Sequence, residues 1–301
     1  MTSVRFGIDL GGTKTEIIAL DQNGKEILRE RRPTPAQSYS EILKTIAELV
    51  FAAEKKIGAT GTVGIGIPGA LSPASGLIKN ANTVCLIGQP LDGDLAKILE
   101  RPVLLANDAN CFALSEATDG AAAGADVVFG VILGTGVGGG IVVHGKVLNG
   151  PNSIAGEWGH NPLPWPLDSE RPGPSCYCGK NGCIETFLSG PGLQRDHKIS
   201  TQTDLTGEQI AAAIGDQSTE STIARFENRL ARSLASVINI LDPDVIVLGG
   251  GLSNLERIYQ SVPRIWDEFV FSDQVDTKLC RAKFGDSSGV RGAAWLWPNS
   301  L

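Results

Sequence analysis

One histidine and three cysteines have the spacing of a metal site. His160 is followed by Cys176, Cys178 and Cys183, so the three thiols fall within eight residues. Tetrahedral Zn²⁺ takes ligands of these types, and four protein ligands leave no open position, as in structural zinc sites. We expect a large chain without a secretion signal to keep its thiols reduced, which favours a metal over disulfides. The sequence therefore predicts a structural zinc here, with adjacent free thiols as the alternative.

Two carboxylates flank the predicted metal loop. Glu157 lies three residues before His160, and Glu185 lies two residues after Cys183. If one ring nitrogen of His160 binds the metal, the other can face a ligand in a fixed orientation. Several polar groups held together suit a polyhydroxylated ligand, because each hydroxyl needs a partner. The alternative is that both glutamates are solvated surface charges.

Three glycine-rich turns could bind phosphate groups or a nucleotide. They lie at Asp9–Lys14, Gly134–Gly140 and Gly249–Gly251. None has the spacing of a P-loop. Glycine lets backbone N–H groups approach phosphate oxygens without a Cβ clash, and an adjacent aspartate could hold water-bound Mg²⁺. The alternative for the first turn is a structural hairpin in which Asp9 stabilises the turn.

Asn107 and Asp108 follow the apolar stretch 103–106. A carboxylate at the end of a strand is well placed to act as a general base toward a sugar hydroxyl. Asparagine and aspartate also favour the N-cap of a helix, and residues 110–117 have a helical pattern. The spacing leaves both roles open.

The elements that position these residues follow one order twice. The segment Phe6–Gly11 aligns with Phe129–Gly134, and each is followed by an apolar strand and a turn ending in Gly-Lys. Alternation and turn signals predict strands, and helical periodicity predicts helices, one of them with Ser38 and Glu41 at capping-box spacing. The expected strands are 4–10, 15–20, 27–31, 63–67, 103–106, 129–134, 140–143 and 245–248, and the expected helices are 39–53, 110–117 and 219–241. Two similar α/β halves with ligands held between them explain this order, and chance similarity is the alternative.

The composition narrows the class of function. With 26 basic and 33 acidic residues, the net charge is −7 and the isoelectric point is near 5.1. An acidic surface repels phosphate backbones, so we expect no nucleic-acid partner. No apolar stretch approaches the roughly 20 residues of a membrane helix, and no leader pattern precedes the first strand. We therefore expect a cytoplasmic protein without a membrane partner.

Taken together, these motifs resemble those of the ROK sugar kinases. The resemblance covers nearly the whole chain, and the order of the motifs is specific. It implies an α/β fold of the actin/hexokinase type, also called ribonuclease H-like, with two duplicated domains and an interdomain cleft. The final helix, 290–297, would return to the first half. The implied domains are 1–117 together with 289–301, and 118–288, which carries the zinc loop.

The resemblance also implies a role for each motif residue. Asp108 would be the catalytic base for phosphoryl transfer from MgATP. The sugar would be bound by Gly69, Asn107, Glu157, His160 and Glu185. ATP would be bound by Asp9, Gly11, Gly12, Thr13, Lys14, Gly134, Thr135, Gly136, Gly249, Gly250 and Gly251. Zinc would be bound by His160, Cys176, Cys178 and Cys183.

Within this family, residues 156–165 and 285–295 look most similar to bacterial fructokinases (mannofructokinases). We therefore expect phosphorylation of fructose, with mannose and glucose as further substrates, to the hexose 6-phosphate. An N-acetylglucosamine kinase is the first alternative, and a non-catalytic sugar-responsive regulator is the second. The resemblance further implies a homodimer.

Overall fold

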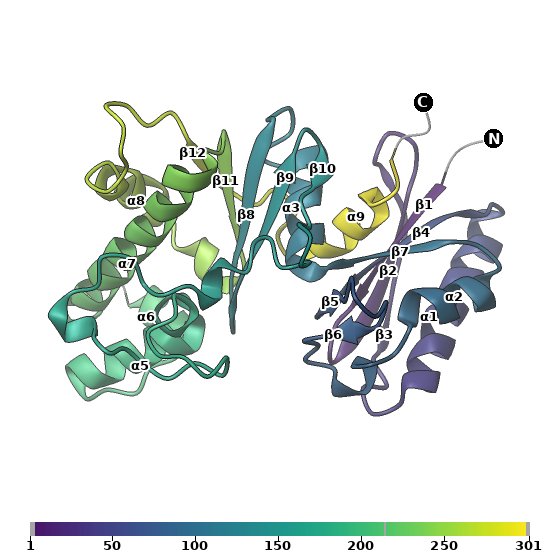
Figure 1. The fold of residues 1–301 in the computed structure, drawn as a ribbon, viewed down its shortest axis with the longest axis horizontal. Coiled ribbons are helices and arrows are strands. Elements are labelled where there is room, and N and C mark those ends of the chain that lie inside the picture. The colour runs from purple at the N-terminus through teal and green to yellow at the C-terminus, as the bar shows by residue number, and fades with distance from the viewer. Residues whose placement is uncertain (1–3, 214, 299–301) are drawn as a thin grey trace. The chain divides into compact units, whose positions relative to one another are not determined.

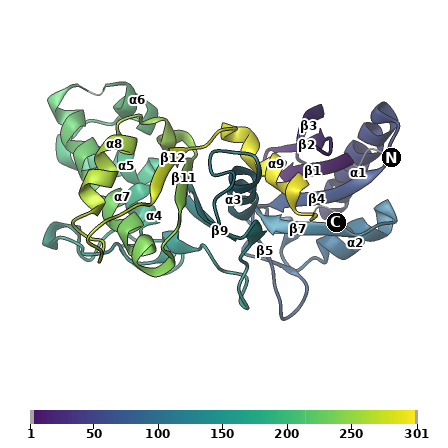
Figure 2. The same ribbon diagram turned by 90° about the horizontal axis from the view of Figure 1, so that it is seen from above.

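The computed structural model describes residues 4–213 and 215–298, drawn as a ribbon in Figures 1 and 2. Two compact units are distinguished by their internal contacts. The first contains residues 1–124, 140–155 and 286–301, and the second contains 125–139 and 156–285. The two units are groups of residues with many contacts among themselves, which is not a test of where the domains end. The predicted domains, 1–117 with 289–301 and 118–288, therefore stay a prediction.

The first sheet has the strand order β3-β2-β1-β4-β7. The first three strands are antiparallel neighbours, and β4 and β7 are added in parallel. Their bounds are β1 (Val4–Leu10), β2 (Lys14–Leu20), β3 (Glu26–Pro33), β4 (Gly61–Ile67) and β7 (Val103–Asn107). A short hairpin, β5 (Ala70–Leu71) and β6 (Ile78–Lys79), follows β4. The central strands are buried on both faces, which explains their near-continuous apolar sequence.

Helices cover both faces of this sheet (Figure 1). On one face, α1 (Tyr39–Ile57) and α2 (Leu91–Leu99) pack against apolar strand residues such as Phe6 and Ile65. The predicted cap of α1 is confirmed, because the Ser38 hydroxyl accepts a hydrogen bond from the Glu41 N–H. The opposite face carries α3 (Asp108–Thr118) and α9 (Ser288–Trp295).

Glycine allows α9 to pack directly on α3. A Cβ at Gly292 would lie 1.6 Å from the carbonyl oxygen of Cys111, which no side chain could tolerate. Charged groups hold the same helix, since Arg291 pairs with Asp119 and Ser288 donates to the buried Glu116. The last described helix therefore belongs to the core of the first unit.

The second sheet has the order β10-β9-β8-β11-β12. Its strands are β8 (Val127–Leu133), β9 (Val137–Val143), β10 (Lys146–Val147), β11 (Val245–Gly249) and β12 (Lys278–Arg281). As in the first sheet, three strands consecutive in the chain are neighbours, and two later strands extend the first of them in parallel. This repeated order confirms the predicted duplication. The strand β12 was not predicted, because its short and half-polar sequence carries no alternating pattern.

The remaining helices belong to the second unit. They are α4 (Glu185–Leu188), α5 (Gly190–Thr201), α6 (Gly207–Ala212), α7 (Gln217–Leu241) and α8 (Ile258–Trp266). The long helix α7 buries one apolar face, including Phe226 and Leu234, and ends at Asp242 in the left-handed conformation. It agrees with the predicted helix 219–241 to within two residues.

Buried charges join α7 to the segment that connects His160 with Cys176. The Glu170 carboxylate accepts hydrogen bonds from Arg229 at 2.7 Å and from Arg232 at 2.9 Å. Arg232 also donates to the carbonyl of Pro164 at 3.0 Å. All three charged side chains are buried, and the arginines lower the pKa of Glu170 against the opposing effect of burial. The cluster therefore fixes the connecting segment to a rigid helix.

We expect Arg232→Met to lower the free energy of unfolding by about 3–5 kcal/mol, because it leaves buried acceptors without their donor. Urea denaturation measures the loss. The matched control is Arg171→Met, whose ion pair with Asp168 is exposed and should contribute about 0–1 kcal/mol. Equal effects of the two substitutions would contradict the anchoring role of Arg232.

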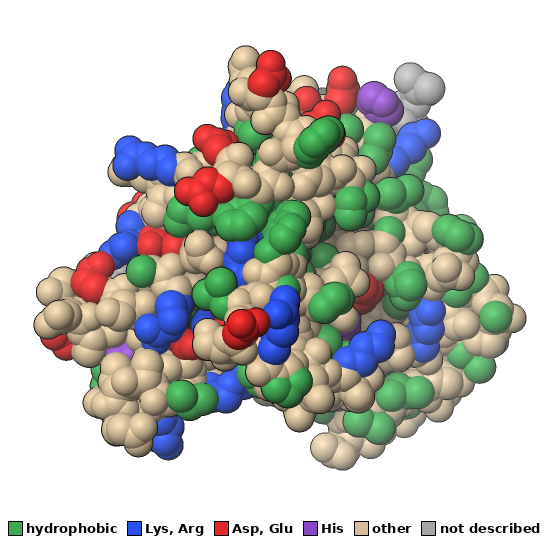
Figure 3. Space-filling model, turned by 60° about the vertical axis from the view of Figure 1, so that its left-hand side comes forward, with side chains coloured by type: hydrophobic (Ala, Val, Ile, Leu, Met, Phe, Trp, Pro, Cys, Tyr) green, Lys and Arg blue, Asp and Glu red, His purple; other side chains and the backbone are tan. Residues whose placement is uncertain are grey.

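The face drawn in Figure 3 carries acidic, basic and apolar side chains interspersed. Among the described helices, none combines the length and the apolar character required to cross a membrane.

Candidate functional site

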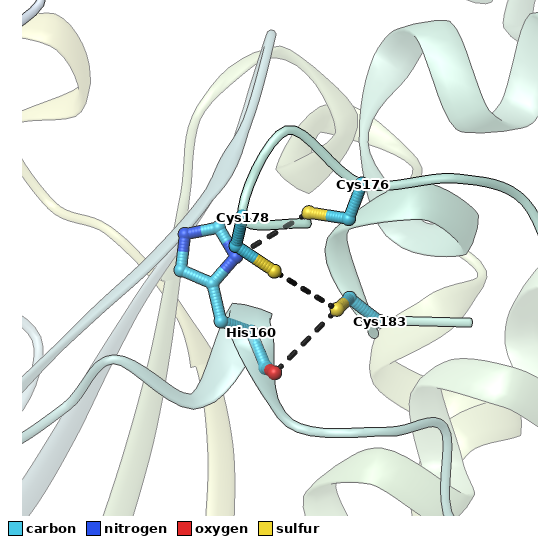
Figure 4. Close-up of side chains that lie close together, drawn as sticks. All are labelled: His160, Cys176, Cys178 and Cys183. Atoms are coloured by element: carbon cyan, nitrogen blue, oxygen red, sulfur yellow. Dashed lines mark hydrogen bonds between the residues drawn. The ribbon is translucent and has the colours of Figure 1, made fainter. Parts of the chain in front are cut away.

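The predicted metal ligands come together in the second unit (Figure 4). One ligand atom from each of His160, Cys176, Cys178 and Cys183 lies within 4.8 Å of all the others. The Nδ1 atom of His160 is 3.5 Å from the Cys176 sulfur, and the sulfurs of Cys178 and Cys183 are 3.6 Å apart. A disulfide needs about 2.05 Å between sulfurs, so all four side chains are available to a metal.

This geometry fits a tetrahedral zinc ion. Bonds of about 2.3 Å to sulfur and 2.0 Å to nitrogen give tetrahedral edges of roughly 3.5–3.8 Å, which match the two distances above. Burial raises the pKa of Cys183 to about 12, so this thiol would stay protonated at neutral pH without a cation. A bound divalent ion stabilises the thiolate. The residues therefore fit structural Zn²⁺, as predicted.

The backbone of the loop brings the cysteines together. The Cys176 N–H donates to the Lys180 carbonyl at 2.8 Å, and the Gly179 N–H donates back to the Cys176 carbonyl at 3.0 Å. An isolated bridge pairs Pro162 with Cys183. These bonds fold 176–183 into a tight hairpin beside the short helical turn Trp158–His160.

The other ring nitrogen of His160 contacts a residue that was not predicted. Its Nε2 atom lies 2.9 Å from the Tyr177 hydroxyl oxygen, and the two rings meet edge to face. Partial desolvation beside His160, followed by the charges of Glu185 and Glu157, raises the pKa of Tyr177 to about 12, although the residue as a whole is largely exposed. Tyr177 therefore contacts His160 and lies within electrostatic reach of Glu157 and Glu185. The sequence offered one signal for Tyr177, because it is the single residue between the predicted ligands Cys176 and Cys178.

The two flanking glutamates have different surroundings. Glu157 is exposed. Glu185 is half-buried at the start of α4, and its Oε2 atom accepts a hydrogen bond from the Val137 N–H at 2.9 Å. The alternative of a solvated surface charge is therefore wrong for Glu185, which joins the metal loop to the glycine turn before β9.

The glycine turns of the second unit lie against neighbouring backbone. The Gly134 carbonyl accepts a hydrogen bond from the Gly190 N–H at 2.8 Å, at the first turn of α5. Thr135 is exposed and Gly136 half-buried. Gly250 has φ +82°, and a Cβ there would lie 2.5 Å from the Leu133 carbonyl oxygen, so only glycine fits. The turns after β8 and β11 are thus adjacent, and Gly190, which was not predicted, borders them.

The first glycine turn is a hairpin between β1 and β2. The Gly11 N–H donates to the Lys14 carbonyl at 3.0 Å, and the Thr34 hydroxyl donates to the Gly11 carbonyl at 2.8 Å. Gly12, Thr13 and Lys14 are exposed. The turn is closed by its own backbone, and its tip remains open to a ligand.

Asp9 lies in β1 just before this turn, on a face of the sheet that carries several charged side chains. It pairs across the strands with Glu16, whose buried carboxylate accepts from Arg29 and Arg31, each at 2.7 Å. Burial is the main cause that raises the pKa of Asp9 to about 6, and the charges of Asp108 and Glu16 add to it. Lys14 and Arg31 oppose the shift. Asp9 and Asp108 are therefore close enough to interact.

We expect Asp9→Asn to raise the free energy of unfolding at pH 8 by about 1–3 kcal/mol, given about 1.4 kcal/mol per unit of pKa shift. The pKa of Asp9 is raised from 3.8 to about 6, so its neutral form favours the fold and this stability is lost as the pH rises through 6. The advantage of asparagine should shrink toward pH 4.5. Urea denaturation at both pH values tests this, with the exposed Asp273→Asn as control. If the difference in free energy of unfolding between Asp9→Asn and the wild type did not change with pH, the prediction would be contradicted.

Asn107 and Asp108 occupy the junction of β7 with α3. Asn107 is the N-cap, and its side-chain oxygen accepts from the Ala109 N–H at 2.9 Å. Its amide donates to the Gly69 carbonyl at 3.3 Å, which brings these two predicted sugar-binding residues together. Asp108 is the first helical residue, and its side chain is exposed although Oδ1 also approaches the Ala109 N–H at 2.8 Å. Asparagine thus takes the capping role that the sequence left open.

Comparisons with known proteins agree with this arrangement. The model of the ROK family matches residues 5–300. The chain is 42% identical over 297 residues to an N-acetyl-D-glucosamine kinase of Yersinia enterocolitica, covering 97% of this chain and 98% of the relative. It is similar in structure to a ROK hexokinase from Thermus thermophilus, with 32% identity, a TM-score of 0.86 and coverage of 98% and 97% of the two chains. A ROK family glucokinase from Streptomyces griseus, in complex with glucose and AMPPNP, has 26% identity and a TM-score of 0.77, with 98% of each chain covered. The predicted two-domain α/β fold of the hexokinase type is confirmed.

Proposed function

Since the chain belongs to the ROK family, we propose that it is a kinase that transfers the γ-phosphoryl group of ATP to a hydroxyl of a hexose. The observation that carries this proposal is the position of Asp108. Its exposed carboxylate follows a buried strand and begins a helix, and its charge acts on Asp9 beside the first glycine turn. A carboxylate that could act as the general base is thus close to a candidate phosphate-binding turn.

In the proposed reaction, the sugar oxygen attacks the γ-phosphorus, and the bond between this phosphorus and the β–γ bridging oxygen breaks. The hydroxyl proton passes to the Asp108 carboxylate, and ADP leaves. Backbone N–H groups at the tips of the two turns, Gly12–Thr13 and Thr135–Gly136, would hold the phosphates, because the Gly11 and Gly134 N–H groups already donate within their own turns. Residues Gly249–Gly251 would take the adenosine. Asp9 would hold the hydrated Mg²⁺, which supplies positive charge to the phosphates. Phosphoryl transfer depends mainly on positioning, so rigid turns suit it.

The second polar group, Glu157, His160 and Glu185 beside the metal loop, is assigned to the sugar. Carboxylates and an imidazole N–H provide acceptors and a donor for neighbouring hydroxyls. A zinc ion at Cys176, Cys178 and Cys183 would hold the imidazole in place. Gly69 and Asn107 are assigned to the same substrate, and a hydrogen bond joins these two residues to each other.

The substrate we propose first is N-acetyl-D-glucosamine, because the relative with 42% identity over nearly the full length bears that activity in its name. Fructose is the second candidate. It is favoured by the resemblance of residues 156–165 and 285–295 to bacterial fructokinases. N-acetyl-D-glucosamine is an aldohexose with an acetamido group at C2, whereas fructose is a ketohexose without one, so an assay with both sugars discriminates well between the two candidates.

A coupled assay of ADP release over N-acetyl-D-glucosamine, fructose, mannose and glucose tests both levels of the proposal. We expect the highest kcat/KM with N-acetyl-D-glucosamine, by at least tenfold. A higher value for fructose would replace the substrate and retain the kinase. No ADP release with any hexose would contradict the kinase, and hexose-dependent DNA binding would then support a regulator.

A further inference from the structure

The two ring nitrogens of His160 face different partners. Nδ1 points to the cysteine cluster, 3.5 Å from the Cys176 sulfur (Figure 4). Nε2 is 2.9 Å from the Tyr177 hydroxyl oxygen, and the ring centroids are 5.0 Å apart at 88°. A metal on Nδ1 leaves the ring proton on Nε2, so His160 is the donor in this hydrogen bond and Tyr177 the acceptor.

An imidazole bound to metal offers one outward N–H. In the structure, the Tyr177 oxygen already accepts it. A sugar hydroxyl that accepts from the same N–H in good geometry must therefore replace the phenol oxygen, since one short and linear bond excludes a second. The phenol and the sugar compete for a single donor.

Tyr177 can leave at little cost. Its side chain is 82% exposed, so the ring loses few packing contacts when it rotates away from His160. Its backbone lies between Cys176 and Cys178, so the residue itself stays at the metal loop when the ring turns away.

We propose that Tyr177 is a positioning residue that caps His160 in the sugar-free protein and is displaced when a hexose hydroxyl takes the Nε2 proton. This inference rests on the proposed function, because it needs a hexose at His160. The capped state holds the imidazole ready and also lowers the apparent affinity for sugar, since only the uncapped fraction can bind.

The variant Tyr177→Phe keeps the ring and removes the competing oxygen. We expect it to lower the Kd for the hexose by about two- to tenfold, the range that corresponds to one ordinary hydrogen bond. The zinc content of purified protein should stay the same. The control is Tyr39→Phe, which removes a hydroxyl bonded to Asp94 in the first unit and should leave the Kd unchanged. A Kd that rises or does not change, or zinc lost from Tyr177→Phe, would overturn the cap.

Fluorine NMR separates this inference from the proposed function. The chain has three tyrosines, so protein labelled with 3-fluorotyrosine should give three resonances, and Tyr177→Phe identifies the one from Tyr177. The probe is the hexose with the highest kcat/KM of the four assayed. Saturating it should shift the Tyr177 resonance, while Tyr39 stays in place. Hexose binding by calorimetry without this shift would overturn the cap alone, whereas no binding of any hexose would contradict the proposed function.

Discussion

Asp108→Asn is expected to lower kcat by about 10²–10⁴-fold, the usual contribution of a general base. Asparagine keeps the size and the polarity of the side chain and cannot take the hydroxyl proton. Hexose binding should stay within about threefold, because the proposed sugar ligands are other residues. Steady-state kinetics and calorimetry measure the two effects separately.

A matched control separates loss of the base from loss of a helix-terminal charge. Asp108 is in the first turn of α3, and Asp92 is in the first turn of α2. Each carboxylate interacts favourably with its helix dipole by about 0.3–1 kcal/mol. Asp92→Asn should therefore lose the same kind of helix-terminal interaction as Asp108→Asn and retain wild-type kcat, while Asp108→Asn also relieves the repulsion between Asp108 and Asp9. Turnover of Asp108→Asn within about tenfold of wild type would remove Asp108 from the role of base.

The second large effect is expected from the metal loop. Cys178→Ala removes one of four ligands, so a content of about one zinc per chain should fall to near zero. The affinity for hexose should drop by about 10–100-fold or more, because His160 loses the ion that orients it. Metal analysis of freshly purified protein and calorimetry with the hexose measure both quantities. A chelator that removes zinc from the wild type should have the same effect on hexose binding.

Cys280→Ala serves as the control for this substitution. Cys280 lies in β12 of the same unit and outside the cluster, and burial raises the pKa of its thiol. It should keep zinc, and its hexose affinity should equal that of the wild type. Freshly purified wild-type protein that contains no zinc would refute the metal assignment, whatever the behaviour of the variants.

The family to which the chain belongs does not by itself determine which sugar is the substrate. The sequence resemblance favoured fructose, and the curated relative with 42% identity is an N-acetyl-D-glucosamine kinase. Under the proposed function, both sugars would use the same phosphate turns and the same base. Selectivity depends on the side chains that line the sugar pocket, and these follow no spacing rule that a single sequence could reveal.

The sequence by itself determined the features that depend on residues close together in the chain. Four ligands with a narrow preference for one metal fall within 24 residues, His160 to Cys183, so short connections alone bring them together. Glycine turns after apolar strands were likewise recognisable, because the strand and the turn are contiguous. The repeated strand order followed from two copies of the same local pattern.

Tertiary structure alone decided which polar groups meet across strands and loops. Asn107 and Asp108 are equally good caps by type, and the path of the chain from β7 into α3 gave the cap to Asn107. Glu16 is buried because the register of β3 brings Arg31 opposite it. Tyr177 reaches His160 because the metal loop folds back onto the turn at 158–160. A buried charge or a shared hydrogen-bond donor is stable only when the fold brings a partner to it. The spacing of residues along the sequence does not tell how far apart such partners lie in space.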